Sequence, residues 1–348
     1  MKMAILRNED PDSAAKWAVA CKKFGVNYTI INLTQSDWFE RFTESSFDFC
    51  LVKPPGLLSH FKTLFDERLF IIAKVLGKPV YPSYEEVIIY ENKKFLSYFL
   101  KANKIPHPAT FVYYHKSEAM GFIEVCKYPL VAKTSIGASG SGVAFLKDKN
   151  SARKYINKAF SKGGIKRRFG PNRVTGSPKI WAEKTLRSPE YFIKKLKKYF
   201  NIYAHGERGF VIFQEFIPHD FEWRAVKIGE SYFAHKKIKT GDKASGSKGI
   251  EYVNPSPEIL DFTRLLCEAN NFNFMAIDFF EDGNGGFLVN ELQTIFGHVQ
   301  DHILEMDGNP GRFLYKDNQW VFERGNFNTN ESYDLRLETA INLYKRGL

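Results

Sequence analysis

The stretch AIDFFEDGNGGFLVNELQ, residues 276–293, places two carboxylates on otherwise apolar segments. Its turn-rich residues 282–286 predict a β-hairpin. If the hairpin is symmetric about residues 284 and 285, Asp278 lies opposite Glu291, and Gln293 projects from the same face. Facing carboxylates repel unless a cation or a proton lies between them, and this set of oxygens suits Mg²⁺. The alternative, a pair of edge carboxylates that point into water, is disfavoured by the apolar flanks.

A glycine-rich loop, SIGASGSG at residues 135–142, follows the strand-like segment YPLVAK. Loops of this kind let backbone N–H groups approach a phosphate chain closely. Lys133 on the preceding apolar strand needs an anionic partner if it is buried, and a phosphate oxygen would serve. The loop is not a Walker A motif, because no Gly-Lys-Ser/Thr follows it. A flexible hairpin without a ligand is the alternative.

Charged residues also punctuate two strand-like segments downstream, FQEFI at 213–217 and EWRAV at 222–226. Glu222 and Arg224 share one face of the second segment, because side chains alternate along a strand.

The charge of the chain is concentrated in one segment. The whole sequence of 348 residues has 50 Lys and Arg against 39 Asp and Glu, but residues 151–210 alone have 16 against 3. Lys166, Arg167, Arg168 and Arg173 lie in a Gly/Pro-punctuated loop, and four lysines decorate a predicted helix at 191–200. The segment is either a solvated face or an electropositive lip for a polyanion, a phosphorylated substrate or an acidic peptide. Nucleic acid is not expected, since no aromatic residues suited to base stacking are interleaved.

Composition predicts a folded protein with a large core, because 44% of the residues are hydrophobic and 16% aromatic. The four cysteines are far apart and form no metal or redox motif. No segment approaches the roughly 20 apolar residues of a membrane span, and the start lacks a signal-peptide pattern. We therefore expect a cytoplasmic protein with buried thiols.

The pattern of elements predicts an α/β protein of three parts. Residues 1–85 alternate short β-rich runs with helices, which indicates a βαβ layer with parallel strands. This part has no GxGxxG after its first strand, so we expect it to shape one wall of a substrate cleft. The second part, residues 86–212, carries the glycine loop and the basic insertion 150–210; the third, 213–348, carries the carboxylate hairpin and a helical tail.

Five segments stand in an order that resembles the ATP-grasp superfamily, particularly carboxylate–amine ligases akin to the enzyme that adds glutamates to a ribosomal protein. They are Asn92-Lys93 opening a helix that ends in IPHPAT, then YPLVAKTSIGASGSGV, FQEFI, EWRAVKIG, and AIDFF paired with VNELQ. The resemblance covers about residues 86–300. It implies an α+β ATP-grasp fold, in which a βαβ pre-ATP-grasp domain precedes two subdomains that clasp a nucleotide.

The resemblance also implies roles for individual residues. Arg224 would stabilise the transferring phosphoryl group or acyl phosphate, with Lys236 as a second cation at that spot. Asp278, Glu291 and Gln293 would hold two magnesium ions, although the family usually has Asn at the last position. ATP would be held by Lys93, Lys133, Ser135, Gly137, Ser139, Gly140, Ser141, Gly142, Gln214, Glu215, Phe216, Ile217 and Glu222.

The implied reaction is ATP-dependent formation of an amide or peptide bond through an acyl phosphate, with release of ADP and phosphate. The substrates would be a small-molecule or peptide carboxylate and an amine, with anionic substrates included, and a homodimer is common among similar proteins. His235 and His298 are candidate general bases, and Arg167 and Arg168 are candidate substrate contacts. The alternatives are a kinase that phosphorylates a hydroxyl and a nucleotide-gated protein that binds a polyanion.

Overall fold

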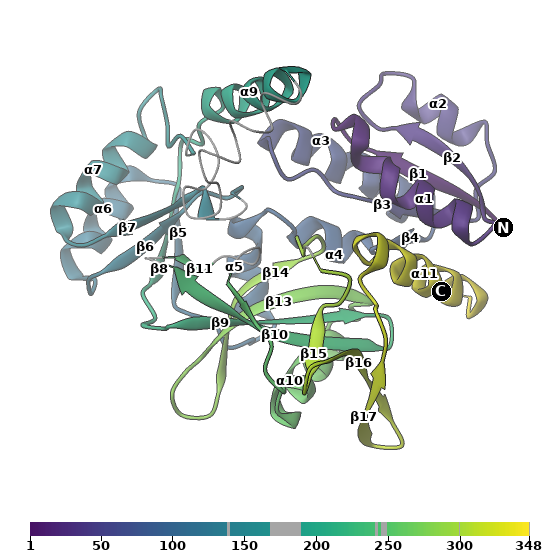
Figure 1. Cartoon of the computed structure of the whole chain (residues 1–348). Coiled ribbons are helices and arrows are strands. Elements are labelled where there is room, and N and C mark those ends of the chain that lie inside the picture. The colour runs from purple at the N-terminus through teal and green to yellow at the C-terminus, as the bar shows by residue number, and fades with distance from the viewer. Residues whose placement is uncertain (138–139, 168–188, 241–242, 245–248, 299, 348) are drawn as a thin grey trace.

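The computed structural model describes residues 1–348 except 138–139, 168–188, 241–242, 245–248, 299 and 348. Figure 1 shows three sheets: two small ones on either side of the upper half, and a larger one beneath them. No helix in the described part of the chain is both long enough and apolar enough to cross a membrane.

The first sheet is parallel and has the strand order β2-β1-β3-β4. Its central strands are almost wholly buried, as expected when helices cover both faces of a parallel sheet. The predicted βαβ layer is therefore confirmed. Its elements are β1 (Lys2–Arg7), α1 (Ala15–Lys23), β2 (Asn27–Asn32), α2 (Trp38–Thr43), β3 (Phe49–Val52), α3 (Ser59–Phe70) and β4 (Val80–Tyr81).

The second sheet is antiparallel, with the order β5-β8-β6-β7. Helices α6 and α7 pack on it through a cluster that includes Ile123, Ile156 and Phe213. Strand β8 pairs with β5 and β6, so the boundary that the sequence predicts between residues 212 and 213 falls inside a strand of this sheet. The elements are β5 (Thr110–Tyr113), α6 (Lys116–Val125), β6 (Leu130–Lys133), β7 (Val143–Leu146), α7 (Lys149–Ala159) and β8 (Val211–Glu215).

The third sheet has nine strands in the described residues, and its main path runs β14-β13-β9-β10-β16-β15. The long strands are β9 (Phe221–Ile228), β10 (Ser231–Thr240), β13 (Phe274–Glu281), β14 (Phe287–Gln293) and β16 (Asn309–Lys316). The short ones are β11 (Lys243–Ala244), β12 (Ile250–Glu251), β15 (Leu304–Met306) and β17 (Gln319–Arg324).

Three helices pack against this large sheet, namely α4 (Tyr84–Ile89), α5 (Lys93–Ala102) and α10 (Pro257–Ala269). Their buried residues, among them Leu96, Leu100 and Leu266, form one cluster with Ala225 and Ile277 of the sheet. A further helix, α9 (Pro189–Ala204), lies between the two upper parts in Figure 1.

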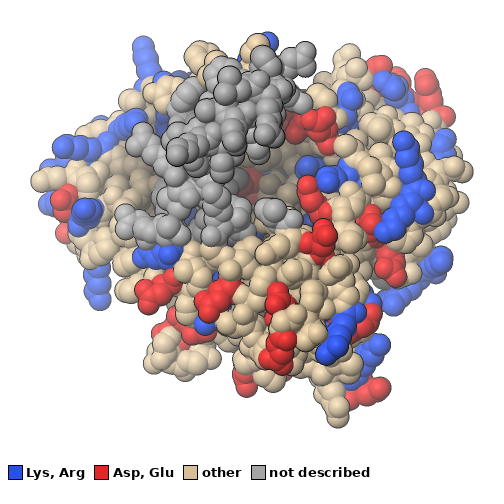
Figure 2. Space-filling view, viewed as in Figure 1, with Lys and Arg blue, Asp and Glu red and all other residues tan. Residues whose placement is uncertain are grey.

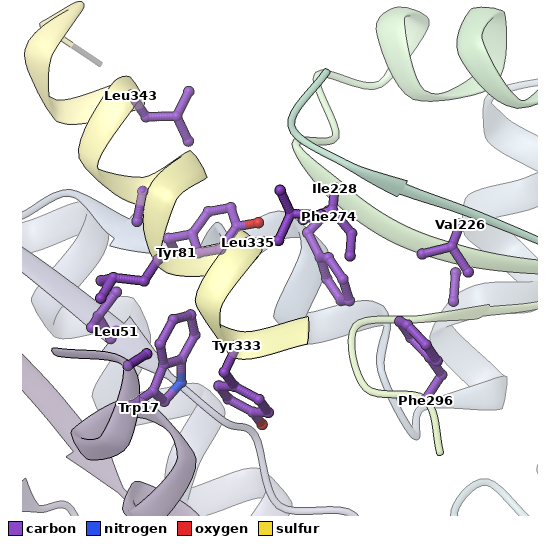
Figure 3. Packing of buried hydrophobic residues seen from close by; sticks show 14 of the residues in the cluster. Trp17, Leu51, Tyr81, Val226, Ile228, Phe274, Phe296, Tyr333, Leu335 and Leu343 are labelled. Carbon is purple, nitrogen blue, oxygen red and sulfur yellow. The ribbon is translucent and has the colours of Figure 1, made fainter. Parts of the chain in front are cut away.

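The C-terminal helix α11 (Tyr333–Lys345) joins the first sheet to the large one. Figure 3 shows its residues Tyr333 and Leu335 between Trp17 and Tyr81 on one side and Ile228 and Phe274 on the other. The rings of Trp17 and Tyr333 meet edge to face, with their centroids 4.8 Å apart. Helix α11 therefore fixes how the N-terminal layer sits on the sheet that carries the carboxylate hairpin.

Replacing the fully buried Leu337 of α11 with alanine tests this packing. We expect Leu337→Ala to lower the free energy of unfolding by about 2–5 kcal/mol, because it leaves a cavity between the two parts. The same substitution at Leu265, which is 56% exposed on α10, should cost less than about 0.5 kcal/mol. Urea unfolding measures both variants, and an unchanged midpoint for Leu337→Ala would show that α11 does not tie the parts together.

Candidate functional site

A cavity of about 370 Å³ lies between the second and the third sheet. One end of it is apolar and the other is crowded with charged side chains. The apolar end includes Val131, Phe145, Phe216, Ile217 and Phe280; the charged end includes Glu91, Lys93, Lys133, Glu222, Arg224, Lys237, Asp278, Glu291 and Gln293. The lining residues come from α5, β6, β7, β8, β9, β10, β13, β14 and the loops between them.

The hairpin β13–β14 places Asp278 directly opposite Glu291, and Gln293 lies opposite Ala276. The pairing predicted from the sequence is confirmed. The register shifts by one residue after Asp278, where Phe279 pairs with Val289. The hairpin is therefore not symmetric along its whole length, and Asn290 is the extra residue of a β-bulge.

The bulge adds Asn290 to the charged end of the cavity. Its side-chain oxygen accepts a hydrogen bond from Lys133 Nζ at 2.7 Å. Its amide nitrogen donates to Glu222 Oε1 at 3.3 Å. Asn290 is a site residue that the sequence prediction missed. The usable signal was that Val289 and Leu292, which both face the core, are three residues apart and so break the alternation of a regular strand.

Asp278 is held by two buried cations. Arg224 donates to its two carboxylate oxygens from Nε and Nη2, at 2.7 Å each. Lys237 Nζ lies 2.7 Å from Asp278 Oδ2 and 2.7 Å from Glu222 Oε2. Burial alone would raise the pKa of Asp278, but Arg224 and Lys237 hold this pKa well below its usual range. The carboxylate is therefore charged at any physiological pH.

The lysine that completes this cluster is Lys237, and the prediction of Lys236 is corrected. Strand β10 pairs with β9 so that Lys237 lies opposite Glu222 and Lys236 lies opposite Trp223. Because side chains alternate, Lys236 points to the other face, where its Nζ lies 3.9 Å from the ring centroid of Phe221. The tight turn at Gly229 and Glu230 was a usable signal, since hairpin symmetry about it places residue 237 opposite residue 222.

Glu291 is paired with Lys93, the first residue of α5. Lys93 Nζ lies 3.0 Å from Glu291 Oε1 and 3.7 Å from Glu91 Oε2. Burial opposes charge on both sides of the Lys93–Glu291 pair, yet their attraction raises the pKa of Lys93 and lowers that of Glu291. Both carboxylates that the sequence assigns to a metal are thus neutralised by cations of the protein.

Lys133, at the end of β6, is the most loosely neutralised cation of the cluster. Its hydrogen bond goes to the neutral side chain of Asn290. The pKa of Lys133 is lowered to about 8, mainly by burial; Glu291 and Glu222 offset part of this effect, and Lys93 and Lys237 add to it. An additional anion at this place would restore its charge.

The glycine loop joins β6 to β7 as an antiparallel hairpin. Gly137 and Gly140 line the cavity. Gly142 packs so closely that a Cβ there would lie 1.7 Å from Thr134 Oγ1. The backbone N–H groups of Ser135 and Gly137 donate to Glu207 and Glu91, two carboxylates that the sequence analysis missed. Ser141 is half-buried beside the lining residues, and Ser139 lies outside the described residues.

The predicted adenine segment lines the apolar end of the cavity through Gln214, Glu215, Phe216 and Ile217. Gln214 Nε2 donates to Thr110 Oγ1 at 3.1 Å, and Glu215 Oε1 accepts the N–H of Ala109 at 2.7 Å. These bonds fix the segment against β5. The apolar side chains around it suit a flat ring that is bound mainly by contact and by backbone groups.

The two candidate histidines are not among the residues that line the cavity. His235 is fully buried opposite Arg224, and its Nδ1 lies 2.9 Å from the carbonyl oxygen of Ile303. His298 Nε2 lies 3.0 Å from the hydroxyl of Tyr252. Burial lowers the pKa of both, to about 4 for His298. Such weak bases beyond the cavity do not support the general-base hypothesis.

The basic segment 151–210 was expected to be either a solvated face or an electropositive lip. The first expectation is wrong for Arg167, which is buried. It is 5% exposed, and its guanidinium donates to the carbonyl oxygen of Leu57 in the first domain. Arg168 lies outside the described residues. Figure 2 shows Lys and Arg side chains spread over both lobes of this face rather than gathered in one patch of the described surface.

Comparison with known proteins places this geometry in a known fold. No protein-family model matches the sequence. The chain is 24% identical over 271 residues to "Alpha-aminoadipate--LysW ligase LysX" of Saccharolobus solfataricus, an alignment that covers 76% of this chain and 82% of that protein.

Two solved structures extend the comparison. The RimK domain ATP-grasp protein of Sphaerobacter thermophilus has a TM-score of 0.53 at 17% identity, with 85% of this chain and 92% of that one covered. The ATP-grasp ligase PsnB, in complex with precursor peptide PsnA2 and AMPPNP, has a TM-score of 0.52 at 12% identity, with coverage of 99% and 98%. The α+β ATP-grasp fold that the sequence motifs predict is confirmed, and this chain has that fold.

Proposed function

We propose that the protein is an ATP-dependent carboxylate–amine ligase. The observation that carries the proposal is the facing pair Asp278 and Glu291 on the cavity wall, with each carboxylate neutralised by buried cations. Buried charges that pair so closely are costly to maintain, and they cluster where a site must handle charged ligands. A magnesium nucleotide supplies both signs, since the metal suits the carboxylates and the phosphates suit the cations.

The two ends of the cavity match the two ends of ATP. The adenine ring would lie at the apolar end, near Phe216 and Ile217, and the triphosphate would extend toward Lys93 and Lys133. Asp278 and Glu291 would hold Mg²⁺, which lowers the charge of the phosphates when it is bound. Gln293 Oε1 accepts a bond of 3.4 Å from Arg224 Nη2. A second ion would therefore have to displace this contact to use the amide oxygen.

The reaction that we propose has two steps, and the charges at the cavity suit both. A substrate carboxylate oxygen attacks the γ-phosphorus, the bond to the bridging oxygen breaks, and ADP leaves. The amine nitrogen then attacks the carbon of the acyl phosphate, inorganic phosphate leaves, and the nitrogen loses a proton. Arg224, Lys237 and Lys93 stabilise the negative charge that passes between these groups, and no nucleophile from the protein takes part.

The comparisons favour this reaction over a kinase or a protein that only binds a polyanion. The curated relative is named as a ligase that joins α-aminoadipate to LysW, and PsnB is named as a ligase with a precursor peptide. We therefore propose a small-molecule or peptide carboxylate and an amine as substrates. ADP release that depends on both co-substrates would support the ligase, and release with an alcohol in place of the amine would favour the kinase.

Glu291→Ala tests the metal assignment directly. We expect the variant to fold, because Lys93 keeps Glu91 as an anionic partner. We expect ADP formation to fall by about 10²-fold or more, since a carboxylate that holds the metal is gone. Glu281→Gln on the same hairpin is the matched control. Glu281 is exposed, and a glutamine there can still accept the hydrogen bond from the indole N–H of Trp223. Near-normal turnover of Glu291→Ala would refute the assignment.

The lowered pKa of Lys133 predicts how nucleotide affinity depends on pH. In the free protein the ammonium loses its proton as the pH rises through about 8, whereas bound phosphate favours the charged form. Above that pH, binding must take up a proton, so the affinity for Mg–ATP should fall by up to about tenfold per pH unit.

Calorimetric titrations between about pH 7.5 and 9.5 measure this dependence. Lys133→Arg is the control, because a guanidinium stays protonated across that range and the fall should disappear. Affinity of the wild-type protein that does not change over the range would contradict the contact between Lys133 and phosphate.

A further inference from the structure

Three consecutive N–H groups at the start of the glycine loop are taken by carboxylates of the protein itself. The N–H groups of Ser135 and Ile136 donate to the two oxygens of Glu207, at 2.6 and 2.8 Å. The N–H of Gly137 donates to Glu91 Oε2 at 2.6 Å. This part of the loop is therefore anchored to the protein, and its three N–H groups are not free for a phosphate.

Glu207 belongs to the stem of the basic insertion. We call the stem the pair of segments, within the insertion 150–210, where Ile165 after α7 and Glu207 after α9 exchange two backbone hydrogen bonds, of 2.7 and 3.0 Å. Two glycines allow this close approach. A Cβ on Gly164 would lie 2.5 Å from the carbonyl oxygen of Glu207, and one on Gly206 would lie 2.7 Å from that of Gly163. The stem thus has a fixed geometry at the point where Glu207 meets the loop.

Arg167 ties the same stem to the first domain. It lies two residues beyond Ile165, is 5% exposed, and donates to the carbonyl oxygen of Leu57. Its charge attracts both Glu207 and Glu91, which partly offsets the cost of burying these carboxylates. The start of the glycine loop, the stem of the insertion and the loop after β3 therefore meet at one group of charged side chains.

Glu91 is held in an unfavourable backbone conformation to make its contact. Its φ is +48°, in the left-handed region that residues other than glycine rarely adopt. Such a conformation persists only where the surrounding structure holds it, and it is concentrated at functional sites. Here it directs a buried carboxylate at the N–H of Gly137.

We propose that Glu207 is a positioning residue for nucleotide binding, through which the stem of the basic insertion holds the glycine loop in its binding conformation. The proposal rests on the proposed function, since Gly137 and Gly140 of the loop line the cavity in which the phosphates of ATP would lie. It deepens that function by giving the insertion a task at the nucleotide site. It also implies that a ligand which moves the stem changes nucleotide affinity.

Glu207→Gln separates positioning from simple electrostatics, because the two predict opposite signs. If Glu207 were only a negative charge near the phosphates, its neutralisation would tighten Mg–ATP binding. If it positions the loop, the loss of one of its two acceptor oxygens should weaken binding and raise the KM for ATP at least tenfold. The kcat at saturating ATP and the KM values for the carboxylate and the amine should stay within threefold of wild type.

Glu124→Gln is the matched control. Glu124 is a surface carboxylate of the same subdomain that pairs with Lys149 and Arg153, and exposed pairs of this kind contribute little. Arg167→Met is the second variant, and we expect it to raise the KM for ATP in the same direction. It also keeps the proposal testable if Glu207→Gln fails to unfold cooperatively.

Hydrogen exchange of the nucleotide-free protein gives a readout that does not depend on activity. The amides of Ser135 and Ile136 should exchange at least tenfold faster in Glu207→Gln than in wild type or in Glu124→Gln. Unchanged or tighter Mg–ATP binding by Glu207→Gln, in a wild type that does bind it, would overturn the proposal alone. A wild type that binds no Mg–ATP would overturn the proposed function as well.

Discussion

The pairing of Asp278 with Arg224 and Lys237 is the interaction on which the rest of the site depends. Carboxylates and cations this deeply buried are tolerated only when each has a partner in good geometry. The requirement fixes the registers of β9, β10 and β13, because the three side chains meet only when Arg224 lies opposite Asp278 and Lys237 lies opposite Glu222. Helix α5 must then be placed so that Lys93 reaches Glu291.

This network makes ligand binding an exchange of partners. In the structure Asp278 and Glu291 form ion pairs with cations of the protein, and Lys93 and Lys237 form ion pairs with its carboxylates. A metal ion could bind both carboxylates fully only if the protein's cations paired with other anions. The phosphates of a nucleotide would be such anions. On the proposed function, the site would therefore favour a metal and a nucleotide together over either one alone.

The sequence predicted the parts of the site that follow from alternation along strands. The position of Asp278 opposite Glu291 and the shared face of Glu222 and Arg224 both rest on the twofold period of a strand. The parallel N-terminal layer was predicted from a different pattern, the alternation of short β-rich runs with helices.

The errors of the sequence analysis arise where long-range packing overrides the local pattern. The bulge at Asn290 shifts the register of β14 against β13, which symmetry about the turn does not predict. Arg167 carries the same charge in a solvated loop as in a buried contact, so only the tertiary structure shows that it meets Leu57. Strand β8 follows the insertion in sequence, yet it pairs with β5 and β6, and no local signal marks that choice.

The exchange of partners is tested most directly by the affinity of the Lys237→Met variant for Mn²⁺ without nucleotide, measured by electron paramagnetic resonance of the free ion. Loss of the lysine removes one of the two cations that hold Asp278 and frees Glu222 Oε2, so we expect Mn²⁺ to bind about tenfold tighter than to wild type, or about 1.4 kcal/mol. The same variant should bind Mg–ATP more weakly, because a cation for the phosphates is gone. Unchanged or weaker Mn²⁺ binding would contradict the account, since it would mean that the buried cations do not compete with the metal for these carboxylates.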